Sequence, residues 1–287
     1  MAGRRRRPSN APGAHYLADP RIAADLLDAA CVRRGDLVLD VGAGAGALAA
    51  RPVGRGARVV AIERDPRLAA RLRRRFDHAN VVVVERDALE VPLPKQPYRV
   101  VANIPFAITT ALLGRLLDEP RADLQTGALI VGLQAARRFA HPRPASARIL
   151  WWSARYELRL LRRIPGSSFS PPSPVAAAAL LVTVRRPPLI PSAHQRAFLS
   201  LVAMALANRR APVGHALAPI FSRRQLRRLL DDLKMSRTEA IGELTVEQWS
   251  TVNAAMVAFV EKSRWPPATT WRSLAQPGSA PHASLGG

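Results

Sequence analysis

The sequence is poor in cysteine, in lysine and in long apolar runs. The shortages of cysteine and of apolar runs exclude disulfides, cysteine-based metal clusters and membrane spans. Cys31 is the only cysteine in 287 residues, so the chain can form no internal disulfide and no cysteine-based metal cluster. The six histidines are scattered without the spacing of metal ligands, so we expect no metal. The longest mainly apolar run, 175–184, is too short to cross a bilayer, and no apolar segment follows the basic N-terminus. The sequence therefore predicts a soluble, cytoplasmic protein.

Acidic residues are also scarce: 43 lysines and arginines face 21 aspartates and glutamates, for a net charge of +22. Only Lys95, Lys234 and Lys262 are lysines, so arginine dominates. Such a charge costs self-repulsion, whereas neutralising phosphates releases counterions and drives association. We therefore expect a nucleic-acid partner, the alternative being a solvated surface without one.

Short apolar segments alternate with helical ones through the first two thirds of the chain. The apolar runs are nearly continuous, which is typical of parallel strands buried on both faces. The last two strands are expected to close the sheet as an antiparallel pair. Strands are predicted at 37–41, 58–62, 81–84, 98–102, 128–133, 156–164 and 177–185, and helices at 20–31, 66–76 and 109–117. This pattern predicts a doubly wound α/β domain.

Three prolines at 187, 188 and 191 interrupt the pattern and mark a boundary. Helices are predicted beyond it at 193–207, at 222–233 and from 245, where Thr245 and Gln248 form a capping box, to 260. The predicted organisation is a basic flexible arm at 1–13, the α/β domain at 14–186, a smaller helical domain at 187–262 and a disordered tail at 263–287.

The segment "LDVGAGAGAL" places Gly42, Gly44 and Gly46 directly after the first predicted strand, where they are expected to open a helix. Ligands of α/β sheets bind at this end of the strands. A dinucleotide fingerprint requires its third glycine where Ala47 stands. The spacing instead fits S-adenosylmethionine, which has no pyrophosphate to cradle; a purely structural turn is the alternative.

Two acidic residues follow the next two predicted strands. Glu63 ends "VVAIE", where its carboxylate can accept both ribose hydroxyls, and Asp87 follows "VVVVE", where it can accept from the adenine amino group. Either acid alone is equally typical of a helix cap or a surface charge. Together with the glycine turn, at successive strand ends, they predict a cofactor site.

The fourth predicted strand ends in Asn103-Ile104-Pro105-Phe106. The side-chain carbonyl of Asn103 and the backbone carbonyl of Ile104 can accept both hydrogens of an exocyclic amine and orient its lone pair for methyl transfer. Pro105 stiffens the turn. Phe106 offers a face for an unstacked base, worth about 1–3 kcal/mol. The alternative is a strand-end turn with Phe106 packed in the core.

In these motifs the chain resembles the Erm-type rRNA adenine N6-methyltransferases, within the wider rRNA adenine dimethylase family. The resemblance covers about residues 14–262 and rests on "AHYL", "LDVGAGAGAL", "VVAIE", "RDAL", "NIPF", "FSPPSPV" and "GELTVEQW". It implies a Rossmann-like class I methyltransferase domain. It also implies that Phe169 forms a second wall of the target pocket, opposite Phe106, and that Leu17, Ala88 and Asn103 contact the cofactor.

The chain departs from the family near its start, where Gln-Asn-Phe-Leu is usual and Ala-His-Tyr-Leu stands here. His15 can still donate to the methionine part of the cofactor. The form "NIPF", rather than an Asn-Leu-Pro-Tyr type, favours the branch acting on 23S rRNA, so the resemblance implies resistance to macrolides, lincosamides and streptogramin B. The alternatives are a small-subunit rRNA dimethyltransferase and a catalytically silent RNA-binding protein.

Arginine suits both phosphate contacts and stacking, so arginine clusters are the candidate RNA contacts. They lie in the arm at 4–7, in "RRAPVGHAL" and in "SRRQLRRLL". The candidates are Arg209, Arg210, Arg223, Arg224 and Arg227. The arginines of "SRRQLRRLL" span more than one helix face, so the alternative for some of them is a solvated surface. The prediction is a monomeric enzyme that methylates N6 of a flipped adenine in 23S rRNA with S-adenosylmethionine.

Overall fold

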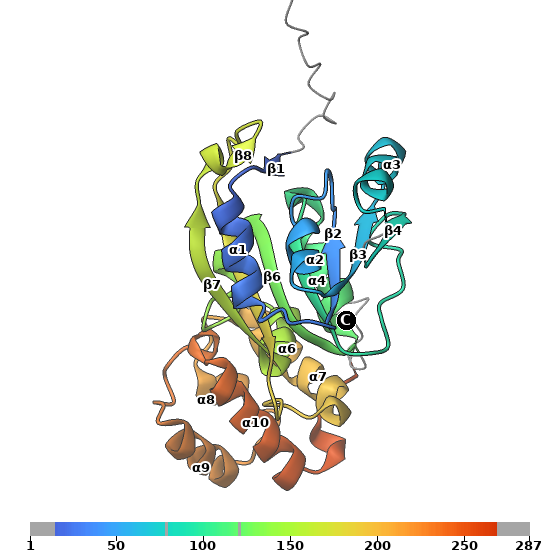
Figure 1. Ribbon diagram of the computed structural model, residues 1–287. Helices are drawn as coiled ribbons and strands as arrows, with labels where there is room; N and C mark the ends of the chain where they lie inside the picture. The colour runs from blue at the N-terminus through green and yellow to red at the C-terminus, as the bar shows by residue number, and fades with distance from the viewer. Residues whose placement is uncertain (1–14, 78–79, 120–121, 269–287) are drawn as a thin grey trace, which may run out of the picture. The chain divides into compact units, whose positions relative to one another are not determined.

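A computed structural model describes residues 15–77, 80–119 and 122–268 (Figure 1). The predicted arm at 1–13 and the tail from 269 onward lie outside this part of the chain. Two compact units are present: Met1–Arg137 with Arg159–Val182, and Arg138–Leu158 with Thr183–Gly287. The sequence predicts a single boundary near 187, whereas the second unit also takes in Arg138–Leu158.

The central sheet has seven strands in the order β4-β3-β2-β5-β6-β9-β7. β2 pairs in parallel with β3 and β5, β3 with β4, and β5 with β6. Because β2 lies between β3 and β5, the direction of winding reverses beside it, which is where ligands bind in such sheets. The strands are β2 (Leu37–Val41), β3 (Arg58–Glu63), β4 (Val81–Glu85), β5 (Tyr98–Asn103), β6 (Leu124–Gly132), β7 (Tyr156–Ile164) and β9 (Ala177–Val184).

These strands confirm the α/β prediction, with shifted bounds. β2 matches it at both ends, because a mainly apolar run lies between Asp36 and Gly42. β6 begins at Leu124, four residues before the predicted start, because Gln125, Thr126 and Gly127 weaken the apolar signal although Thr126 is buried.

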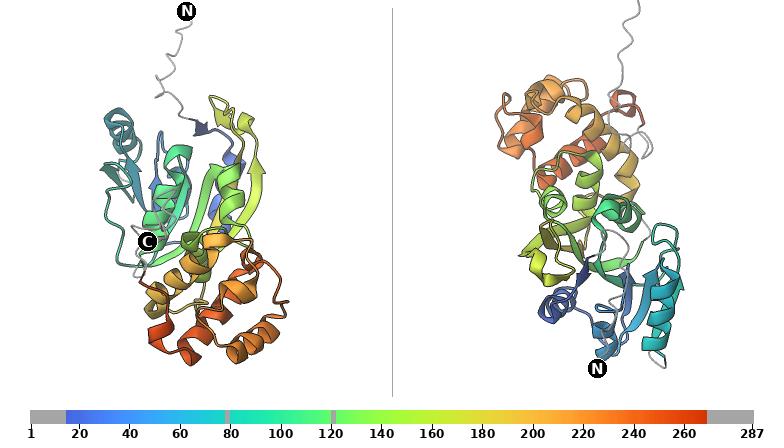
Figure 2. Two further views of the ribbon diagram at one scale, coloured as in Figure 1. Left: turned by 180° about the vertical axis from the view of Figure 1, so that it is seen from behind. Right: turned by 90° about the horizontal axis from the view of Figure 1, so that it is seen from above.

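Helix α1 (Pro20–Ala29) precedes β2, whereas α2 (Ala50–Gly54), α3 (Pro66–Arg75), α4 (Thr109–Asp118) and α5 (Leu133–Phe139) follow strands of the sheet. Asp19 and Asp65 cap α1 and α3 by accepting from backbone N–H groups two residues on, and a proline begins each helix. α1 and α4 both contact β6, from opposite faces of the sheet (Figure 2). The helix expected to open at the glycines begins only at Ala50 and has five residues, because three positive-φ glycines hold the preceding turn out of helical geometry.

A second, two-stranded sheet was not predicted. β1 (Tyr16–Leu17) pairs antiparallel with β8 (Phe169–Ser170), and the amide of Ala18 donates to the carbonyl of Ser168. Segments more than 150 residues apart thus lie side by side, which brings "AHYL" to "FSPPSPV".

The second unit is helical. The capping boxes at Ser222 with Gln225 and at Thr245 with Gln248 set where two of its helices begin, as predicted for the latter. α6 was not predicted; it carries Trp151 and Trp152, both fully buried. The helices of the second unit are α6 (Ala147–Arg155), α7 (Gln195–Ala205), α8 (Val213–Ala216), α9 (Arg223–Leu233) and α10 (Val246–Phe259).

The end of the described chain reaches into the predicted tail. Lys262–Arg264 form a 3₁₀ turn, and Nε1 of Trp265 donates to the carbonyl of Val260 at 3.0 Å. Residues 263–268 of that tail are described, and the rest of it lies outside the described chain. No helix among the described residues has the length and apolar character needed to cross a membrane.

Candidate active site

The glycine turn lies at the carboxyl end of β2. The amides of Gly42 and Ala43 donate to the carbonyl of Ile62 at 2.9 and 3.1 Å, so the turn is fastened to the neighbouring strand. Gly44 has φ +56°, and a Cβ there would lie 2.7 Å from the ring of Tyr16. No side chain fits at this position, so Gly44 keeps the turn open and close to Tyr16.

Glu63 ends β3 and is nearly buried, at 8% exposure. Its Oε2 accepts from the amide of Gly44 at 2.8 Å, and its Oε1 accepts from the amide of Asp65 at 2.9 Å. The carboxylate is thus held against the glycine turn by two backbone donors. Each oxygen keeps a further lone pair, which is what its predicted contact with ribose hydroxyls requires.

Asp87 and Ala88 follow β4 and are half-buried. One carboxylate oxygen of Asp87 accepts from the amide of Leu89 at 2.8 Å, which forms a tight local turn. Among the described residues none donates to the other oxygen. The predicted contact of Asp87 with an adenine amino group, and that of Ala88 with the cofactor, stay predictions.

Asn103 ends β5, and its amide group has a defined orientation. Nδ2 donates to the backbone carbonyl of His15 at 2.9 Å. A carbonyl can only accept, so the NH₂ group must face His15, and Oδ1 points away as an acceptor. No described residue donates to that Oδ1.

The turn after Asn103 leaves a second acceptor open. The amide of Ile104 continues the sheet by donating to Ile130, while the carbonyl of Pro105 accepts from Ile108 at 3.0 Å and starts the next helical turn. Within the described chain, no group donates to the carbonyl of Ile104. The side chain of Ile104 is buried, at 1% exposure, and anchors the loop. The two acceptors predicted for the amine are therefore available on a fixed turn.

This turn adjoins the glycine turn. A Cβ on Gly42 would lie 3.7 Å from Cδ of Pro105 and 3.8 Å from the backbone oxygen of Asn103. Both turns lie at the carboxyl edge of the parallel strands, one on each side of the point where the winding reverses. The sequence prediction that these motifs meet is consistent with this placement.

The two aromatic residues predicted to hold the base differ in accessibility. Phe106 is half-buried: it packs against the core and against Gly132. Phe169 is 3% exposed and belongs to the core cluster, together with Leu17 at 7%. Phe106 therefore has the more accessible ring, and the roles predicted for Phe169 and Leu17 stay predictions.

Tyr16 and Asp40 are two residues at this edge that the sequence analysis did not identify. The ring of Tyr16 covers Gly44, and burial together with the nearby carboxylates of Glu63 and Asp65 raises the pKa of its hydroxyl. The position of Tyr16 between His15 and Leu17 in the recognised motif was the available signal. Next to it, Nδ1 of His15 donates to the carbonyl of Pro171 at 3.0 Å, which leaves Nε2 for another partner.

Asp40 lies in β2 beneath the glycine turn and is 1% exposed. Burial raises the pKa of its carboxyl to about 7; the amide of Ala49 lowers it and the charge of Glu63 raises it further. The amide of Ala49 is near, but neither oxygen of Asp40 completes a hydrogen bond with a described residue, so burial dominates. A residue inside a buried strand is expected to be apolar, so the sequence alone did not indicate that Asp40 is buried.

The candidate RNA-binding arginines lie in the second unit. Arg209 is partly engaged, because its Nη2 donates to the carbonyl of Gly242 at 3.4 Å. Arg210, Arg223, Arg224 and Arg227 are exposed. Their contact with RNA stays a prediction.

A glycine turn, two acids and an Asn-Ile-Pro-Phe turn at the switch point of a parallel sheet define a class I methyltransferase. The groups fit S-adenosylmethionine: carboxylates for hydroxyl and amino donors, and an open backbone turn where no side chain fits. Among the described residues, no three His, Cys, Asp or Glu side chains gather closely enough to hold a metal ion.

Comparison with known proteins identifies the family. Residues 9–267 match the model of the family "Ribosomal RNA adenine dimethylase". An rRNA adenine N-6-methyltransferase from Bacillus licheniformis is 31% identical over 90% of both chains. A ribosomal RNA small subunit methyltransferase A from Synechococcus is 34% identical over 83% of this chain and 88% of its own. The crystal structure of the 23S rRNA methyltransferase ErmE superimposes with a TM-score of 0.76 at 26% identity, covering 84% of this chain and 99% of that one.

The chain therefore belongs to the ribosomal RNA adenine dimethylase family. This confirms the recognition from sequence, the enzyme class of S-adenosylmethionine-dependent rRNA adenine N6-methyltransferase, and the cofactor. It also confirms the α/β methyltransferase fold.

Proposed function

We propose that the protein methylates N6 of one unpaired adenine in 23S rRNA, and that this confers resistance to macrolides, lincosamides and streptogramin B. The observation that carries the adenine-N6 chemistry is the orientation of Asn103. Its NH₂ is bound by the carbonyl of His15, and its Oδ1 is left as an acceptor on a residue whose backbone adjoins the glycine turn.

The amine of adenine is a weak nucleophile because its lone pair is delocalised into the ring. Oδ1 of Asn103 and the carbonyl of Ile104 accept one N–H each, which holds the nitrogen with its lone pair directed at the cofactor. S-adenosylmethionine supplies an electrophilic methyl group on a positively charged sulfur. The methylated nitrogen then loses a proton along one of these hydrogen bonds to solvent, so no side chain has to act as a general base.

The base must first leave its stack, which costs a few kcal/mol. Phe106 returns about 1–3 kcal/mol by stacking. Its half-buried position supports this role, because the side chain packs against the core and is still partly accessible.

The choice of 23S rRNA rests on Phe106, where the small-subunit branch more often has tyrosine, and on the likeness to ErmE. The relative from Synechococcus, at 34% identity, favours the second candidate, a small-subunit rRNA dimethyltransferase.

The test is incubation of the protein with 23S and 16S rRNA, free and in subunits, and with methyl-labelled S-adenosylmethionine. Nuclease digestion and mass spectrometry then locate the label and count the methyl groups. Label on one 23S adenine, with a raised macrolide tolerance of cells expressing the protein, supports the proposal.

Label confined to 16S rRNA would assign the second candidate. RNA binding without label under all conditions would identify a silent RNA-binding protein. An Asn103→Ala chain is the negative control for label incorporation, because it loses the acceptor together with the bond to His15.

A further inference from the structure

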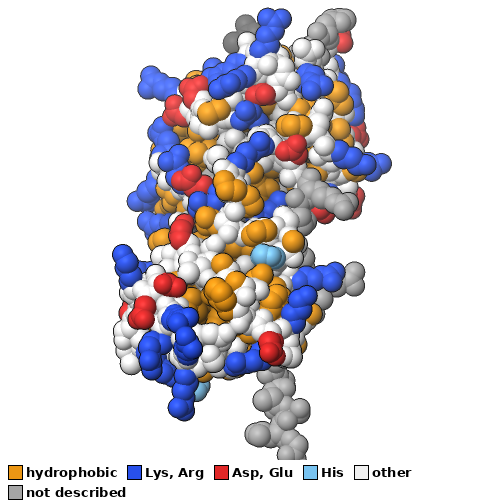
Figure 3. Space-filling view, turned by 90° about the horizontal axis from the view of Figure 1, so that it is seen from below, with side chains coloured by type: hydrophobic (Ala, Val, Ile, Leu, Met, Phe, Trp, Pro, Cys, Tyr) orange, Lys and Arg blue, Asp and Glu red, His pale blue; other side chains and the backbone are white. Residues whose placement is uncertain are grey.

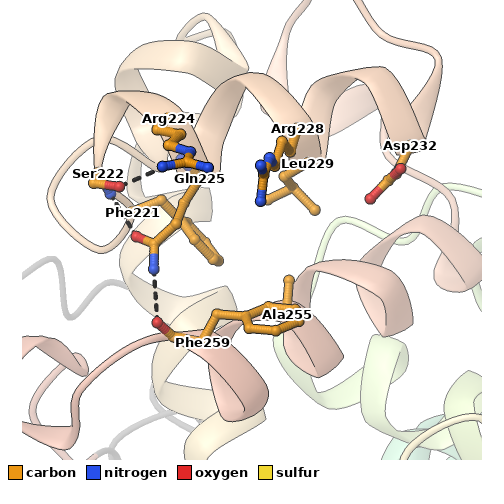
Figure 4. A pocket seen from close by; sticks show the side chains of 9 residues that line it. All are labelled: Phe221, Ser222, Arg224, Gln225, Arg228, Leu229, Asp232, Ala255 and Phe259. Atoms are coloured by element: carbon orange, nitrogen blue, oxygen red, sulfur yellow. Dashed lines mark hydrogen bonds between the residues drawn. The ribbon is translucent and has the colours of Figure 1, made fainter.

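The second unit contains a groove between α9 and α10 that the methyl-transfer chemistry does not use. Its volume is about 570 Å³, within the range of roughly 300–1,000 Å³ typical of ligand sites. The lining residues that matter are Arg224, Arg228 and Asp232 on α9, and Ala255 and Phe259 on α10. Figure 4 shows the two guanidinium groups on the α9 side, with the ring of Phe259 across from them.

The α10 side of the groove is an exposed apolar surface. Phe259 is 73% exposed, the most exposed of the large apolar side chains in the described chain. From Gln248 to Phe259 the helix has no charged residue, although Ala254 and Ala258 are exposed. The end of α10 is held in place, because Nε2 of Gln225 donates to the carbonyl of Phe259 at 2.6 Å. The aromatic ring is therefore presented to solvent on a fixed backbone.

The α9 side carries more positive than negative charge, since Arg224 and Arg228 line the groove together with Asp232. In the described chain, neither Arg224 nor Arg228 forms an ion pair or a side-chain hydrogen bond, whereas Arg143 pairs with Glu243 in the same unit. Arg223 and Arg224 also occupy the first turn of α9, where a helix dipole disfavours cations. The apolar stripe of α9 is explained by its buried leucines, Leu226, Leu229, Leu230 and Leu233. Their burial does not explain why arginines occupy the first turn of the helix.

An exposed aromatic ring beside unpaired arginines is the arrangement by which proteins hold single-stranded nucleic acid, with bases stacked and phosphates paired. Lys and Arg side chains also lie among apolar patches on the face shown in Figure 3. Asp232, at the other end of the groove, repels phosphate and can accept a hydrogen bond from a base amino group. A bound nucleotide is therefore favoured in one orientation along the groove.

We infer that this groove binds an unpaired nucleotide of the rRNA substrate, with its base on Phe259 and its phosphate between Arg224 and Arg228. The inference rests on the proposed function only in that the substrate is RNA. It adds a second point of RNA contact, separate from the target adenine.

The test measures binding of a fluorescent single-stranded RNA oligonucleotide to the full chain over a range of salt concentrations. We expect Phe259→Ala to weaken binding about ten-fold with an unchanged salt dependence, and Phe259→Trp to retain affinity. We expect Arg228→Gln to lower the slope of log affinity against log salt by about 0.7, the value of one phosphate contact to a single strand.

Arg196→Gln is the matched control, because it removes the same charge from the same unit at an exposed residue of α7 that does not line the groove. Equal loss in Arg196→Gln and Arg228→Gln would mean that only general electrostatics acts, and would overturn the inference. Unchanged RNA affinity in Phe259→Ala would also overturn the inference. If that variant lost self-association instead, a second copy of the chain would be the occupant of the groove.

The readout does not depend on which rRNA is methylated. The wild type can bind the oligonucleotide, and the groove variants can bind it less well as expected, while no 23S adenine is labelled. In that case the proposed 23S target is wrong and the inference that the groove binds RNA is retained. Unchanged S-adenosylmethionine affinity in each variant verifies that the first unit remains folded.

Discussion

The strand-end site and the α9–α10 groove use polar groups in opposite ways. At the strand ends, Glu63 and Asn103 are bound to backbone groups before any ligand arrives. In the groove, Arg224 and Arg228 have no partner within the described chain, and Phe259 faces solvent. Methyl transfer needs acceptors held in position, because reorganising them during the reaction would lower the rate of methyl transfer. Affinity for a flexible strand needs only charge and a stacking surface, which can remain unpaired until RNA binds.

The largest expected effect distinguishes the two regions by kinetics. Asn103→Ala should lower kcat about 10²–10³-fold, since a preorganised polar contact to the reacting group is lost. Its affinities for S-adenosylmethionine and for the RNA oligonucleotide should stay unchanged. Steady-state methylation assays check this, with Phe259→Ala as the counterpart that should raise KM and preserve kcat.

Full activity of Asn103→Ala would remove the proposed amine contact. Equal effects of both variants on kcat and KM would erase the distinction between a chemical site and a binding groove.

Glu63→Gln should weaken S-adenosylmethionine binding by about 1.5–3 kcal/mol, roughly ten-fold or more in Kd. A carboxylate accepts from both Gly44 and Asp65, whereas a glutamine amide can accept with only one of its two atoms. Isothermal titration calorimetry measures the change. Glu85→Gln is the control: Glu85 is the register partner of Glu63 at the end of β4, and its exposed pair with Arg73 adds little. Equal losses in the two variants would contradict the assignment.

Gly44→Ala should destabilise the protein by about 1–3 kcal/mol and reduce cofactor affinity, because a side chain at positive φ is strained and its Cβ would overlap Tyr16. Gly54→Ala is the matched control, since a Cβ there meets nothing within 4 Å. Thermal unfolding with and without S-adenosylmethionine compares them. Similar melting temperatures for both variants would show that the turn is not constrained.

The smallest effect is a pH dependence of stability at Asp40. Its folded-state pKa is raised from 3.8 to about 7, so the stability associated with the protonated carboxyl is present below pH 4 and is lost as the pH rises through 7. Asp40→Asn cannot ionise, but its amide would also lack partners, so we expect a net gain of about 1–2 kcal/mol above pH 7. The gain should shrink toward pH 5. Urea unfolding at pH 5 to 8.5 measures it, and a gain independent of pH would exclude ionisation as its cause.

The sequence by itself determined the local elements and the positions of the polar residues at the strand ends. The β2 bounds, the aspartate caps of α1 and α3, and the capping box of α10 follow from signals within a few residues. The order of glycine turn, Glu63, Asp87 and Asn103 followed as well, since parallel strands end at one edge.

Only the tertiary structure decided which distant segments meet. The β1–β8 pairing, the bond from Asn103 to His15, the burial of Asp40 and the α9–α10 groove join residues whose local sequence has no signal for their partners. α6 also escaped prediction: no side-chain cap marks its start, and its polar residues Ser153 and Arg155 are buried in the packed structure. Local propensity is encoded over a few residues, whereas pairing, burial and cavities depend on where the rest of the chain packs.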